Sequence, residues 1–160
     1  MFRALLLSLA LPSVALANPS HAALESASWN KLATKNHADA GPVDVYSTEI
    51  GGVDCFRATA TTDASAAKMM EVVVDIEAAT AWSSAGVTEA KTLKNTGGRI
   101  EYYEFLDVPG WTMASDRFWF LWSTYGVEGE THAFRWDRLV DGGEHAAAYA
   151  DVKTRHPSAI

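Results

Sequence analysis

The strongest constraint on how this chain can fold is an aromatic-rich stretch at residues 98–125. Its pattern predicts two antiparallel strands joined by a connection that contains Pro109-Gly110. The second strand is apolar on both faces, since successive side chains of a strand point to opposite sides. Such a strand must be covered on both faces or must line an apolar space, so we expect either a filled core or the wall of a ligand cavity. One face carries Phe118, Phe120 and Trp122, and the other carries Arg117, Trp119, Leu121 and Ser123.

The first residues have the form of a secretory signal peptide. Arg3 supplies the positive charge, residues 4–11 form a short apolar run, and Ala-Leu-Ala at 15–17 is a cleavage sequence of small residues. The apolar run is too short to span a bilayer. We therefore expect residues 1–17 to be removed and residues 18–160 to form one exported domain, in the periplasm or, alternatively, in the medium.

The net charge of the chain limits the classes of partner that it is expected to bind. The sequence has 20 Asp and Glu residues against 13 Lys and Arg residues, a formal net charge of −7. An acidic surface repels nucleic-acid phosphates and anionic lipid headgroups. We expect no nucleic-acid partner and no stable membrane insertion after signal cleavage. The sequence leaves the oligomeric state open.

The first half of the mature chain predicts a helix followed by a β-hairpin. Apolar residues recur at imperfect helical spacing over residues 22–37, which favours a helix there. Alternating segments at 43–49 and 53–61 flank Gly51-Gly52, which is a signal for a hairpin turn.

The second half predicts one more helical region and then a run of strands. Residues 64–75 carry an apolar stripe at helical spacing, and either Asp63 or Ser65 can cap their first turn. After Asp141 we expect no segment of helical length. This order predicts an α+β fold with an antiparallel sheet. The expected helical turn lies at 77–82, and the expected strands lie at 87–94, 99–107, 114–125, 131–140 and 145–154.

The sequence carries no motif for catalysis or metal binding. Its five histidines lack metal-ligand spacing, and it has no nucleophile elbow, phosphate loop or dinucleotide-binding motif. We therefore expect no catalytic residue, no metal and no cofactor. The single cysteine, Cys55, is expected to be a buried apolar side chain or, alternatively, to form an intermolecular disulfide. Four carboxylates are expected on a solvated strand face or, alternatively, as an acid–base pair: Glu101, Glu104, Asp107 and Asp116.

Short motifs spaced along the chain resemble the START family of lipid-transfer domains, and in particular its exported bacterial members. Each motif is weak alone, but the set in this order is specific. The resemblance extends from about residue 29 to residue 125. The motifs are Trp29, VDVYS at 43–47, FRA at 56–58, Asp75 with Trp82, IEYY at 100–103 and SDRF at 115–118.

The resemblance implies a helix-grip fold, in which a curved antiparallel β-sheet packs with helices around an apolar cavity. It also implies binding or transfer of a lipid or other apolar small molecule rather than a reaction. Two alternative functions fit the same sequence: an enzyme of cyclase or hydrolase type on this scaffold, and a non-catalytic structural module. The residues expected to line the cavity are Tyr102, Glu104, Trp111, Met113, Arg117, Trp119 and Leu121.

Two features depart from the family pattern. Sterol-binding relatives bury an acidic and a basic residue, and here Glu104 matches the acidic position whereas Ser123 matches the basic one. A lone buried carboxylate is expected to take up a proton or to meet another partner. Alternatively, Glu104 lies on the solvent side. The family's C-terminal closing helix is expected to be missing here, which predicts an incomplete domain at the C-terminus.

Overall fold

The computed structural model describes residues 19–38, 41–112 and 114–160. The signal peptide expected at residues 1–17 lies outside the described residues and stays a prediction. Within the described ranges, no helix is both long enough and apolar enough to cross a membrane.

The chain divides into two compact units, one ending at Asp63 and one comprising Ala64–Ile160. One antiparallel sheet has three strands in the order β1-β2-β3, and the other has four strands in the order β4-β5-β6-β7. The expectation that residues 18–160 form a single domain stays a prediction.

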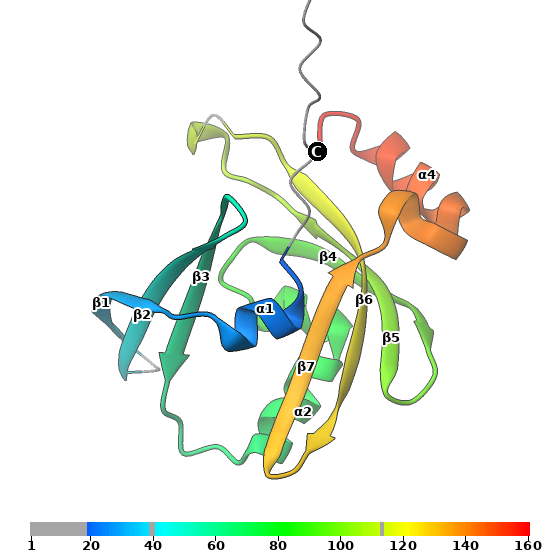
Figure 1. The fold of residues 1–160 in the computed structure, drawn as a ribbon. Coiled ribbons are helices and arrows are strands. Elements are labelled where there is room, and N and C mark those ends of the chain that lie inside the picture. The colour runs from blue at the N-terminus through cyan, green and yellow to red at the C-terminus, as the bar shows by residue number, and fades with distance from the viewer. Residues whose placement is uncertain (1–18, 39–40, 113) are drawn as a thin grey trace, which may run out of the picture. The chain divides into compact units, whose positions relative to one another are not determined.

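The first unit contains a short helix and the three-stranded sheet (Figure 1). The predicted hairpin is confirmed, because Gly51 and Gly52 form its turn with φ of 60° and 81°. Glycine adopts this left-handed backbone without a steric penalty. Cys55 is buried and its thiol donates to the Val53 carbonyl oxygen at 3.5 Å, which agrees with the apolar interpretation. The elements are α1 (His21–Ser26), β1 (Asn30–His37), β2 (Gly41–Ile50) and β3 (Val53–Ala60).

The helix predicted over residues 22–37 is wrong for most of its length, because α1 ends at Ser26 and β1 follows. The strand is fixed by polar contacts to its neighbour. The Lys31 ammonium lies 2.7 Å from an Asp44 carboxylate oxygen, and the Thr34 hydroxyl donates to the same carboxylate at 2.6 Å. These cross-strand contacts, together with the β1–β2 ladder, outweigh a weak helical periodicity.

The second unit contains the predicted helix and the four-stranded meander. Ser65, rather than Asp63, caps α2, because the Ser65 hydroxyl accepts a hydrogen bond from the Lys68 amide at 3.2 Å. The aromatic strand begins at Arg117 and extends to Glu128. The elements are α2 (Ala66–Val74), η1 (Ile76–Ala78), α3 (Ala79–Trp82), β4 (Val87–Asn95), β5 (Arg99–Leu106), η2 (Gly110–Thr112), β6 (Arg117–Glu128), β7 (Thr131–Arg138), η3 (Val140–His145) and α4 (Ala146–Arg155).

Different segments cover the two faces of the four-stranded sheet. On one face Ile76 of η1 packs with Tyr102 in a buried cluster. On the other face Val152 of α4 packs with Tyr103 and Phe120. Tyr102 and Tyr103 are neighbours on β5 and therefore point to opposite faces. Helices thus cover both sides of this sheet (Figure 1), as the apolar residues on both faces of β6 required.

The strand predicted at residues 145–154 is wrong, because the helix α4 (Ala146–Arg155) lies there. Four of the ten residues of α4 are alanine, which has the highest helix propensity, and Tyr149 and Val152 are three residues apart on its sheet-facing side. The prediction that no segment after Asp141 has helical length is therefore also wrong. This helix packs on the sheet face that carries Tyr103, whereas η1 packs on the opposite face, which carries Tyr102.

A tight turn lets α4 return to the sheet. Asp141 and Gly142 both have left-handed backbone, with φ of 49° and 77°. A Cβ added at Gly142 would lie 2.6 Å from Cβ of Tyr149, so only glycine permits this close approach. A helix, rather than the predicted strand, follows this turn.

Candidate functional site

A cavity of about 390 Å³ lies between the α2–α3 segment and the four-stranded sheet. We call it the grip cavity. Its size falls in the range of small-molecule sites, roughly 300–1,000 Å³. Every residue lining it belongs to the second unit. They are Val73, Ile76, Ala79 and Trp82 from the helical side, and Tyr102, Glu104, Leu121, Phe134 and Trp136 from the sheet.

The register of the strands determines which residues of the sheet face the grip cavity. Tyr102 on β5 pairs with Leu121 on β6, so the two side chains lie next to each other on one face. The next position on that face of β5 is Glu104, opposite Trp119. On the helical side Ile76 is only 4% exposed and packs against Tyr102. An aromatic and aliphatic surface therefore surrounds one carboxyl group.

Of the described residues that line the grip cavity, Glu104 alone is charged. It is half-buried, which decides against a position on the open solvent side. Among the described residues it has neither a hydrogen-bond nor a salt-bridge partner, and Ser123, at the matched basic position, bonds instead to the Ile100 carbonyl oxygen at 3.5 Å. Burial raises the pKa of the Glu104 carboxyl. Burial, and secondly the charge of Glu104, raises the pKa of the Tyr102 phenol.

Two tryptophans form an exposed apolar rim to this cavity. Trp82 at the end of α3 is 53% exposed and Trp136 on β7 is 56% exposed. Large apolar side chains that remain accessible at the edge of a concave surface are typical of binding sites. The cavity therefore has an apolar entrance as well as an apolar interior.

The structure brings together some of the residues predicted to line a cavity. Tyr102, Glu104 and Leu121 all line the grip cavity. Trp119 is half-buried on the same face of the sheet but is not among the lining residues. Arg117 is exposed at the start of β6, away from the cavity.

The connection between β5 and β6 contains the other predicted lining residues. Trp111 lies in η2 and is 84% exposed, so it does not contribute to the cavity. Met113 lies outside the described residues.

Sequence reasoning missed the residues that α2–α3 and β7 contribute. Val73 and Ile76 belong to the apolar stripe of the predicted helix, which indicated a buried face but not what it faced. Phe134 and Trp136 alternate on a predicted strand, and this period-two spacing was the available signal for a second aromatic wall.

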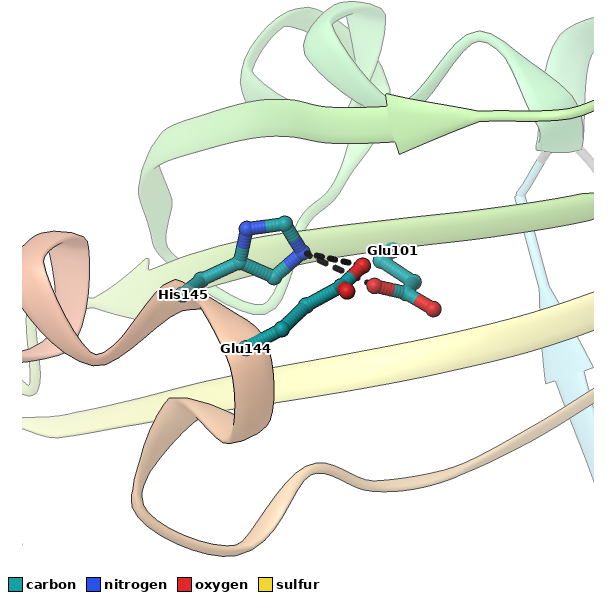
Figure 2. Close-up of side chains that lie close together, drawn as sticks. All are labelled: Glu101, Glu144 and His145. Carbon is teal, nitrogen blue, oxygen red and sulfur yellow. Dashed lines mark hydrogen bonds and ion pairs between the residues drawn. The ribbon is translucent and has the colours of Figure 1, made fainter.

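The opposite face of β5 carries a different carboxylate arrangement, drawn in Figure 2. Glu101 is only 6% exposed, so its predicted place on a solvated face is wrong. His145 Nε2 lies 2.8 Å from one of its oxygens, and Arg99 Nε donates to the other at 3.0 Å. Burial raises the pKa of Glu101, but the hydrogen bonds from His145 and Arg99 outweigh it, and the net pKa is lowered.

Glu101, Glu144 and His145 each offer one ligand atom, and these atoms lie within 4.8 Å of one another. Cations of the protein already occupy the carboxylates, because Arg99 pairs with Glu101 and Lys94 pairs with Glu144. A metal ion would have to displace or compete with both. The arrangement instead links the η3 segment to β5 by charge.

The comparisons with known proteins concern the fold. Among solved structures, a STAR-related lipid transfer protein from Xanthomonas axonopodis is similar to this chain, with 22% sequence identity and a TM-score of 0.58. The match covers 71% of this chain and 61% of the solved one. No protein-family model and no curated protein matches the sequence. The chain has the START-like, helix-grip α+β fold that its sequence resemblance predicted.

Proposed function

We propose that this protein binds a lipid or another apolar small molecule in the grip cavity. The observation that carries the proposal is the cavity itself: about 390 Å³, with an aliphatic and aromatic lining around one carboxyl group that has no partner among the described residues. A core that only stabilised the fold would be filled, since protein interiors are close-packed.

The energetics favour an apolar ligand. Transfer of about 300 Å² of apolar ligand surface out of water contributes on the order of 7 kcal/mol, at roughly 25 cal/mol per Å². The cost of immobilising the ligand offsets part of this gain. The volume suits one compact ligand or one hydrocarbon chain.

Glu104 and Tyr102 would orient the ligand. A carboxyl group with a raised pKa and a neighbouring phenol offer both a donor and an acceptor within an apolar wall. The complementary ligand has one hydroxyl or amine at the end that reaches Glu104. A charged carboxylate or phosphate at that end would be repelled.

One further observation and one prediction favour binding and transfer. The similar solved structure is of a protein described as a lipid transfer protein. The signal sequence expected at residues 1–17 would export the chain, and we propose the periplasm as its location, where insoluble cargo needs a carrier.

The test compares two adjacent substitutions on α2. Val73 lines the cavity and is half-buried, whereas Val72 is 40% exposed and does not line it. Val73→Trp should fill the cavity, and Val72→Trp is the matched control of equal size. Native mass spectrometry of each protein, purified from a bacterial envelope, measures the bound adduct.

The proposal expects an adduct of lipid mass on the unmodified chain and on Val72→Trp, and its loss from Val73→Trp. An adduct that persists in Val73→Trp would place the ligand elsewhere. A chain without an adduct that also fails to bind added 1-decanol would overturn the proposal.

A further inference from the structure

We propose that the protein has a second ligand site, on the face of the sheet opposite the grip cavity, for a single-chain amphiphile with an anionic headgroup. The site is a pocket of about 380 Å³ beside α4, which we call the α4 pocket. In the part of the chain that the structure describes, it shares no lining residue with the grip cavity. Its lining residues are Phe118, Phe120, Arg138, Leu139, Tyr149, Lys153, Ala159 and Ile160.

The floor of the α4 pocket is aromatic. The Tyr149 ring centroid lies 5.6 Å from that of Phe118 and 5.4 Å from that of Phe120. Phe120 is 2% exposed and belongs to the buried cluster around Val152. These rings form a rigid apolar surface of the kind that contacts a hydrocarbon chain.

Two cations lie at the edge of this apolar floor. Arg138 ends β7 and Lys153 is in the last turn of α4, and both are exposed. Among the described residues, no carboxylate lies within ion-pair distance of either. The Lys153 ammonium lies 6.0 Å from the centroid of the Tyr149 ring.

Three other cations of the second unit have an ion-pair partner. Lys94, Arg99 and Arg155 each pair with a glutamate. In a chain of net charge −7, the described side chains that line the α4 pocket include two unpaired cations, Arg138 and Lys153, and no acidic group. A ligand that complements this pocket has an anionic headgroup at the pocket's edge, near the two cations, and an apolar chain inside the pocket.

The walls of the pocket are held by backbone hydrogen bonds. The Leu139 amide donates to the Phe120 carbonyl oxygen at 2.7 Å, and the Ile160 amide donates to the Asp116 carbonyl oxygen at 3.0 Å. The volume lies near the lower end of the range for small-molecule sites, roughly 300–1,000 Å³. One hydrocarbon chain fits this space better than two, which favours a fatty carboxylate over a two-chain phospholipid.

The test uses decanoate and 1-decanol, which share a chain length but differ in charge. Each is titrated into the full chain by calorimetry at low ionic strength, below the concentration at which decanoate forms micelles. Intermolecular NOEs from the ¹³C-labelled ligand locate it. We expect decanoate to show NOEs to Leu139 and Tyr149, and 1-decanol to show NOEs to Ile76 and Leu121.

Two double variants decide whether the cations recognise the headgroup. R138Q/K153Q should weaken decanoate binding about fivefold or more, and added salt should reduce the difference, because exposed charge contacts are modest and screened. K35Q/K91Q removes the same charge from two exposed lysines that do not line the α4 pocket and should leave affinity unchanged.

Three results would overturn the proposal. The first is NOEs from decanoate only to residues of the grip cavity. The second is equal weakening by both double variants, which would show a general effect of surface charge. The third is no binding of decanoate monomers, including the case in which the chain binds only vesicles of anionic phospholipid. The titration with 1-decanol tests ligand binding in the grip cavity separately. A negative result with decanoate would therefore overturn the second site without counting against the proposed function.

Discussion

Two carboxylates three residues apart on β5 have opposite environments. Glu101 is buried beside His145 and Arg99, and its pKa is lowered. Glu104 faces the grip cavity without a partner among the described residues, and its pKa is raised. The segment that covers Glu101 carries charged side chains, whereas α2–α3 places only aliphatic and aromatic side chains around Glu104. The carboxylate of Glu101 on one face of β5 thus stabilises the fold, whereas the carboxylate of Glu104 on the other face is available to a ligand.

The largest expected effect tests whether the two faces differ in packing. Phe120→Ala removes a side chain that is 2% exposed on the α4 side and should cost about 3–5 kcal/mol. Leu121→Ala on the cavity side should cost only about 2 kcal/mol, because Leu121 is half-buried and already borders open space. Urea unfolding of the ligand-free chain measures both. Equal losses would show that the two faces are packed alike.

The next effect concerns the paired carboxylate. Glu101→Gln should cost about 2 kcal/mol at pH 7, because it removes charge-assisted hydrogen bonds from a buried site. The folded-state pKa of Glu101 is lowered, so its stabilisation is present above the pKa of the unfolded chain and is lost as pH falls through the folded-state pKa. The difference from the unmodified protein should therefore shrink in acid.

An exposed pair provides the control for Glu101. Glu128 pairs with Arg135, and the Glu128 side chain is 59% exposed. Glu128→Gln should have a smaller effect on stability than Glu101→Gln, since exposed ion pairs contribute little. A loss at Glu128 as large as that at Glu101 would contradict the structural role assigned to the buried carboxylate.

The smallest expected effect is a gain, rather than a loss, in the stability of the folded chain. The folded-state pKa of Glu104 is raised, so ionisation of this carboxyl opposes folding as pH rises through that pKa. Glu104→Gln should therefore stabilise the ligand-free chain at pH 8 by less than about 1 kcal/mol, and should have almost no effect at pH 4. Melting temperatures at the two pH values measure this. Destabilisation at pH 8 would show that the carboxylate has a favourable partner.

The sequence predicted those parts of the fold in which local pattern and tertiary contacts agree. The family resemblance implied that Tyr102, Glu104 and Leu121 line a cavity, and the structure puts all three in one cavity. The Gly51-Gly52 hairpin followed from turn chemistry alone. The fold class could therefore be inferred from the sequence.

The errors arose where tertiary contacts decide. The strand β1 is held by contacts of Lys31 and Thr34 to Asp44, which no local periodicity reveals. The helix α4 is short, and only Tyr149 and Val152 mark its buried side. One of the two partners of Glu101, His145, is 44 residues away in the chain, so the burial of Glu101 beneath the η3 segment could not be inferred from neighbouring positions.

The most direct test of this account is a pH titration of the side-chain carboxyl carbons of Glu101 and Glu104 by ¹³C NMR, in one sample of the full chain. We expect Glu101 to titrate below the usual range of glutamate and Glu104 to titrate above it. We also expect 1-decanol to shift the Glu104 resonance and to leave that of Glu101 unchanged. Coincident midpoints, or a response to 1-decanol at Glu101 alone, would contradict the assignment of the ligand site to the α2 side of the sheet.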